Sequence, residues 1–108
     1  MDEPEPTAEE VAARIGLVVD RHGAQLDRCY NQSAKAFTPD QPLQGTVDIQ
    51  FEVMPTGEAR NVRVVANDTG SDQLGECLAG LIGSWELPKT GAEGPLEFRW
   101  PFRFSPAR

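Results

Sequence analysis

The strongest constraint on the fold is a run of alternating residues from Gly45 to Val53. Every second residue of this run is hydrophobic: Val47, Ile49, Phe51 and Val53. The residues between them are polar: Thr46, Asp48, Gln50 and Glu52. Successive side chains of a β-strand point to opposite faces of a sheet, so the pattern predicts a strand with one buried face. Other segments of the chain must cover that face.

A β-turn is predicted where this strand ends, at residues 54–57. Pro55 favours the first central position of a turn, and Gly57 accepts a positive φ. The chain then returns through residues 59–65 as a second, valine-bearing strand. An isolated hairpin is only marginally stable in water, so the hairpin of residues 43–66 needs a third strand and a helical cover.

Two amphipathic helices are predicted, one on each side of the hairpin. The first begins at a capping box, Thr7 to Glu10, and ends near Ala36 because Pro39 follows. Its hydrophobic stripe is Val11, Ile15, Val18, His22, Leu26 and Cys29. The second helix begins after Ser71, a favourable N-cap, and ends before Pro88. Its hydrophobic stripe is Leu74, Cys77, Leu78, Leu81, Ile82 and Trp85.

A third strand is predicted over residues 96–104, where hydrophobic and polar residues alternate again. Pro101 has no backbone N–H to donate, so this strand is expected at a sheet edge with Pro101 turned outward. The elements then predict an α+β domain in which two helices pack on one face of a three-stranded antiparallel sheet. The expected core anchors are Phe51, Trp85, Trp100 and Phe102.

The length of 108 residues suits one domain with a single core, which we place at residues 7–105. Residues 1–6 are acidic and contain two prolines, a composition typical of an extended linker. The chain has no hydrophobic run near the roughly 20 residues of a membrane-spanning helix, and its start lacks the pattern of a signal peptide. Any targeting information is therefore expected on a longer parent protein.

The charge of the chain argues against nucleic acid as a partner. Ten lysines and arginines stand against 17 aspartates and glutamates, which gives a net charge of −7. Such a chain repels a phosphate backbone and offers no continuous basic patch.

The two cysteines, Cys29 and Cys77, lie on the predicted hydrophobic stripes of the two helices. They would meet if the helices lie side by side, so we predict a disulfide; the alternative is two free thiols in a reducing cytoplasm. The bond would link residues 48 positions apart, and the chain-entropy model gives it about 4 kcal/mol of stabilisation. A disulfide also indicates an oxidising compartment.

The sequence gives no support for catalysis, a metal or a cofactor. Zinc requires three or four ligands, and a lone His22 with two separated cysteines is a poor supply. On a hydrophobic stripe, His22 is expected to be a packing residue with a hydrogen bond rather than a general base. Neither a Gly-x-Ser-x-Gly nucleophile motif nor a glycine-rich phosphate loop occurs. We therefore expect a domain that is not an enzyme.

The order of these motifs resembles the C-terminal domain of TonB-type energy transducers. The matching features are residues 43–51, the turn Pro55-Thr56-Gly57, residues 62–65, Trp85 before Pro88, and the closing aromatic strand. Three further motifs resemble the AgmX/PglI C-terminal domain, a TonB-like module of myxobacterial envelope and gliding-motility proteins. These motifs are Cys29-Tyr30, Glu76-Cys77-Leu78 and Trp100-Pro101-Phe102. The resemblance covers residues 15–104.

The resemblance implies a periplasmic binding domain at the end of a protein anchored in the inner membrane. TonB-like domains capture an extended segment of an outer-membrane partner at a sheet edge and so pass proton-motive work outward. The corresponding edge here carries Arg99, Pro101 and Arg103, which we expect to contact a protein partner. Pro101 departs from that pattern because it removes one donor from the edge. Two alternatives stay open: a purely structural module of an envelope assembly, and a small secreted enzyme or inhibitor.

Overall fold

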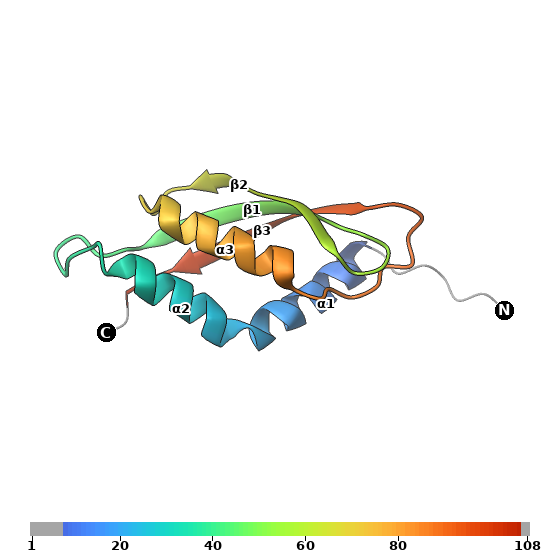
Figure 1. Cartoon of the computed structure of the whole chain (residues 1–108), viewed down its shortest axis with the longest axis horizontal. Coiled ribbons are helices and arrows are strands. Elements are labelled where there is room, and N and C mark those ends of the chain that lie inside the picture. Colours follow the sequence, from blue (N-terminus) through green and yellow to red (C-terminus); the bar gives the residue numbers. More distant parts are fainter. Residues whose placement is uncertain (1–7, 107–108) are drawn as a thin grey trace.

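The computed structural model describes residues 8–106, which form three helices and three strands (Figure 1). The helices are α1 (Ala8–Arg21), α2 (Gly23–Ala34) and α3 (Asp72–Ser84). The strands are β1 (Gly45–Val53), β2 (Ala59–Asn67) and β3 (Leu96–Phe104). The predicted linker of residues 1–6 and the capping residue Thr7 lie outside the described residues.

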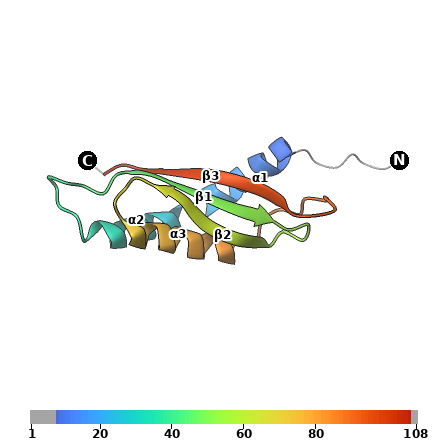
Figure 2. The same ribbon diagram turned by 90° about the horizontal axis from the view of Figure 1, so that it is seen from above.

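The three strands form one antiparallel sheet in the order β2-β1-β3, which confirms the predicted α+β fold. β1 pairs with β3 through nine consecutive residue pairs without a shift. Its pairing with β2 shifts twice, between Asp48 and Ile49 and between Gln50 and Glu52. Because β1 is the central strand, β3 with Pro101 lies at a sheet edge, as predicted. Figure 2 shows α3 on the β2 side of the molecule and β3 along the opposite edge.

The hairpin between β1 and β2 closes through the predicted turn. The Gly57 N–H donates to the Met54 carbonyl at 2.8 Å, and Gly57 has a φ of 97°. A Cβ atom at Gly57 would collide with the Leu87 carbonyl oxygen, so glycine is required there for a second reason. The Leu87 N–H donates to the Gly57 carbonyl at 2.9 Å. This bond fastens the tip of the hairpin to the segment that follows α3.

The single first helix predicted from the sequence is wrong, because the chain breaks at His22 into α1 and α2. His22 has φ −99° and ψ 19°, outside the usual helical range, and the next residue is Gly23, a poor helix former. Figure 1 shows the change of direction between the two helices. As a result α1 brings Gly16 against Trp100 of β3, while α2 lies beside α3.

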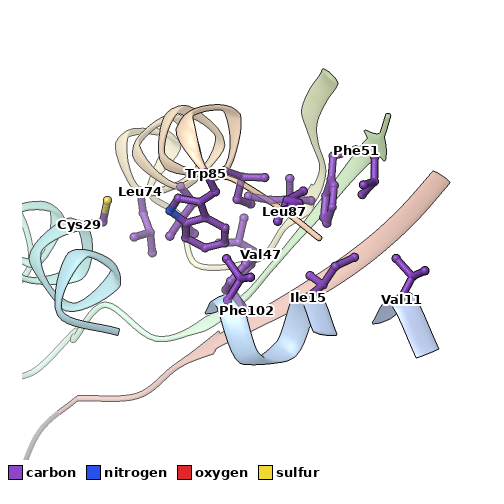
Figure 3. Packing of buried hydrophobic residues seen from close by; sticks show 14 of the residues in the cluster. Val11, Ile15, Cys29, Val47, Phe51, Leu74, Trp85, Leu87 and Phe102 are labelled. Atoms are coloured by element: carbon purple, nitrogen blue, oxygen red, sulfur yellow. The ribbon is translucent and has the colours of Figure 1, made fainter. Parts of the chain in front are cut away.

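One hydrophobic cluster joins residues of all three helices to the sheet (Figure 3). The four hydrophobic residues of β1 are all buried, as the alternation predicts. Phe51, Trp85 and Phe102 are buried, with 2%, 5% and 6% of their surface exposed. Trp100 is only half-buried. Because β3 is an edge strand, Trp100 has a strand neighbour on one side only, and its ring lies against Gly16 of α1.

The predicted disulfide between Cys29 and Cys77 is present and joins α2 to α3, with the two Cα atoms 5.8 Å apart. Cys29 is buried and Cys77 is half-buried. The helix break and the disulfide act together: the turn at His22 directs α2 towards α3, and the bond holds the two helices side by side.

Candidate functional site

The backbone of β1 determines which residues of β3 face the free edge of the sheet. The Thr46 carbonyl accepts from the Asp68 N–H at 3.2 Å, and the Thr46 N–H donates to Asp68 Oδ1 at 2.6 Å. Thr46 therefore directs its backbone groups to the β2 side. Adjacent residues of a strand direct these groups to opposite sides, so Val47 bonds to β3, where its register partner is Phe102.

It follows that Arg99, Pro101 and Arg103 direct their backbone groups away from the sheet, as predicted. Arg99 and Arg103 each present an N–H and a C=O to the free edge, whereas Pro101 presents only a C=O. At Pro101 the edge therefore lacks a donor between the N–H groups of Arg99 and Arg103. The side chains of all three residues are exposed, on the sheet face opposite to the buried Phe102.

The two arginine side chains of this edge differ in their surroundings. Arg99 forms an ion pair with Asp48 of β1, with Nη2 and Oδ2 2.7 Å apart. The Arg99 side chain is 60% exposed, so the pair contributes little to stability, but it holds the guanidinium over the sheet. Within residues 8–106, Arg103 forms no ion pair. Arg103 is therefore the arginine that is available to a bound segment.

A groove of about 310 Å³ lies beside the C-terminal half of β3, between that strand and α2. Its hydrophobic lining comes from Leu26, Tyr30, Phe102 and Phe104, and its polar lining includes Asp27 and Arg103. The rings of Tyr30 and Phe104 are nearly parallel, with centroids 5.6 Å apart. The Tyr30 hydroxyl donates to the Leu43 carbonyl at 2.7 Å. Tyr30 is therefore held in the groove wall by two contacts, one through its ring and one through its hydroxyl.

Leu26 and Tyr30 are not among the site residues predicted from the sequence. Leu26 lies on the predicted hydrophobic stripe of the first helix, and Tyr30 follows the stripe residue Cys29, so the pattern gives neither residue a role in binding. In the structure both are only half-buried, because the turn at His22 leaves α2 beside β3 with a space between them. Tyr30 itself is the available signal of a partly exposed position, since a tyrosine side chain usually keeps its polar end near water.

His22 packs as predicted. Its Nδ1–H donates to the Val18 carbonyl at 2.8 Å, and its ring stacks on Trp85 with centroids 4.7 Å apart. Among residues 8–106, no three histidines, cysteines, aspartates or glutamates gather where they could hold a metal ion. Within the same residues, no helix has the length and hydrophobicity needed to cross a membrane.

Comparison of the chain with models of protein families, with curated proteins and with solved structures gave no match. The function must therefore be argued from the edge of β3 and the groove beside it.

Proposed function

We propose that this chain is a non-enzymatic protein-interaction domain that binds an extended segment of a partner along the free edge of β3. The observation that carries the proposal is the position of the groove: it adjoins the half of the edge where Arg103 presents a free N–H and C=O. Main-chain hydrogen bonds give affinity in this mode of recognition, and a pocket for alternate side chains gives specificity.

A bound segment would continue the sheet beyond β3. Its backbone would accept from the N–H groups of Arg99 and Arg103 and donate to the outward carbonyls. Every second side chain would point to the core side of the sheet, where the groove lined by Tyr30 and Phe104 offers a hydrophobic site. The partner carbonyl opposite Pro101 finds no donor, which lowers affinity by about 0.5–1.5 kcal/mol.

The proposal extends to the cellular setting. Disulfides persist in oxidising compartments, so the Cys29–Cys77 bond supports a location outside the cytoplasm. With the resemblance to TonB-like and AgmX/PglI C-terminal domains, this favours a periplasmic domain of an inner-membrane-anchored, envelope-spanning protein. The partner is then a protein of the periplasm or the outer membrane. The same resemblance favours a role in gliding motility or energy transduction.

Substitution of Pro101 tests this proposal directly. The probe is an extended decapeptide selected for binding to the wild-type chain from a displayed peptide library. Pro101→Val restores one edge donor, so we expect the peptide to bind about two- to tenfold more tightly, or the variant to self-associate through the repaired edge. Calorimetric titration measures the first effect and sedimentation measures the second.

Pro95→Val is the matched control, because Pro95 is exposed and lies one residue before β3. This variant is expected to bind as the wild type does. An unchanged affinity and an unchanged monomer for Pro101→Val would remove β3 as the binding edge and favour a module that only packs within an assembly.

A further inference from the structure

A second groove lies on α1, on the side where that helix meets the segment after α3. It consists of two adjoining hollows of about 440 and 340 Å³, which share Val18, Arg21 and Glu86 among their lining residues. α1 forms one wall together with His22 and Gln25, and residues 84–88 form the other. None of the residues that line this groove lines the groove beside β3.

The wall formed by α1 carries an exposed leucine between two arginines. Leu17 is 59% exposed, the largest exposed fraction among the large hydrophobic residues of the described chain. Arg14 lies three residues before it and Arg21 four residues after it, so all three side chains share one face of the helix. Both arginines are exposed, and within residues 8–106 neither forms a salt bridge.

Two residues of the second wall, Trp85 and Leu87, are held in place by packing and by a backbone hydrogen bond. Trp85 and Leu87 are buried, with 5% and 6% of their surface exposed. The Trp85 ring stacks on His22, and the Leu87 N–H is bonded to the Gly57 carbonyl. A partner that enters the groove therefore meets a surface that is already ordered, which reduces the entropic cost of binding.

The charge of the lining is opposite in sign to the charge of the whole chain. Arg14 and Arg21 line the groove, and Glu86 is the single acidic residue that does so. The chain as a whole has a net charge of −7. A net positive groove on an acidic protein favours an acidic partner, because its two arginines attract carboxylates while the chain as a whole is negatively charged.

We propose that this groove docks an acidic amphipathic helix of a partner protein. Arg14 and Arg21 are seven residues apart on α1, which corresponds to a rise of about 10.5 Å along the helix. Two carboxylates one heptad apart on a facing helix have the same spacing. A leucine between those carboxylates packs on Leu17 and covers its exposed surface. This second docking surface is independent of the free edge of β3, so either can fail without the other.

The test uses a synthetic helical 16-residue peptide with Glu, Leu, Leu and Glu at positions i, i+3, i+4 and i+7. A second peptide with both glutamates replaced by glutamine is the control ligand. Binding to the full chain is measured by fluorescence anisotropy at low and at physiological salt. We expect the acidic peptide to bind more tightly than its control and to weaken as salt is added, since the groove is exposed.

Variants of the chain locate the contact. The double variant Arg14→Glu with Arg21→Glu should weaken binding about tenfold or more, and Glu86→Gln should strengthen it. Arg28→Glu is the matched control, because Arg28 is exposed on α2 and lines neither groove; it should bind as the wild type does. Thermal melts establish that each variant is folded.

Three results would overturn the assignment. The first is equal binding of the acidic and the glutamine peptides, or no saturable binding up to about 1 mM. The second is a set of NMR shift changes centred on Tyr30 and Phe104 instead of Leu17. The third is a self-associated wild type that Leu17→Asp converts to a monomer, which would make a second copy of the chain the occupant.

Discussion

The side chain of Trp85 connects the end of α3 to the bend between α1 and α2. This tryptophan is the first residue after α3, and its backbone is extended, with φ −76° and ψ 145°. Trp85 is buried in the core, and its ring is stacked on His22 at the break between α1 and α2. The side chain thus links the end of one helix to the bend between two others.

Trp85→Ala should therefore be strongly destabilising. Removal of a buried tryptophan costs about 3–5 kcal/mol, a large part of the stability of a small domain. Trp100→Ala should cost less, because Trp100 is half-buried on an edge strand. Urea denaturation of both variants measures the two free energies of unfolding. An equal or larger loss at Trp100 would contradict the packing described for these two residues.

The sequence predicts the face that Trp100 occupies but not how deeply it is buried. The alternation in residues 96–104 predicts which face Trp100 occupies, because the period of two depends only on local geometry. Its degree of burial depends on which strand is the edge and on where α1 passes. Pro101 indicated the edge, but the position of α1 follows from the break at His22. The hydrophobic stripe does not predict that break, because the stripe continues through His22.

At the scale of elements, the break between α1 and α2 accounts for the main difference between the predicted and the observed fold. The stripe runs through His22 without interruption, and hydrogen bonds span the bend, from the His22 N–H to Val18 and Val19 and from the Leu26 N–H to His22. Periodicity therefore indicates one helix. Gly23 is the local signal of a break, although a single glycine within a helical pattern is often tolerated.

The groove beside β3 could not be predicted for the same reason. The strand and its outward residues Arg99, Pro101 and Arg103 follow from alternation and from proline chemistry. The groove requires the direction of α2, which the packing of His22 on Trp85 and the disulfide between α2 and α3 determine. Such contacts join residues that are far apart in the sequence, so a local sequence pattern does not predict them.

Reduction of the disulfide should weaken the junction of α2 and α3. The bond links residues 48 positions apart, for which the chain-entropy model gives about 4 kcal/mol. At about 4–8 °C per kcal/mol for a domain of this size, the melting temperature should fall by more than about 10 °C in the presence of a reductant.

The variant with both Cys29→Ala and Cys77→Ala is the control, since its melting temperature should be low and should not respond to the reductant. Calorimetry or circular dichroism measures both proteins. A wild-type melting temperature that is unaffected when both thiols are shown by alkylation to be free would contradict a structural role for the bond.

In the whole molecule, stability and the proposed recognition use separate surfaces. The helices and the buried face of the sheet provide stability, with the hairpin tip fastened to the segment after α3. We propose that recognition uses the free edge of β3 with its groove, and that a second partner contact uses the groove on α1. In this proposal, a partner segment continues the sheet at β3.

The proposal can be tested by amide hydrogen exchange of the chain, free and bound to the selected decapeptide. In the free chain the amides of Trp100 and Phe102 should already be protected, because they face β1, while those of Arg99 and Arg103 should exchange rapidly. On binding, the account predicts new protection at Arg99 and Arg103 and little change at Trp100 and Phe102. Saturating peptide that protects the edge of β2 or the surface of α1, and leaves Arg99 and Arg103 exchanging as before, would contradict the account.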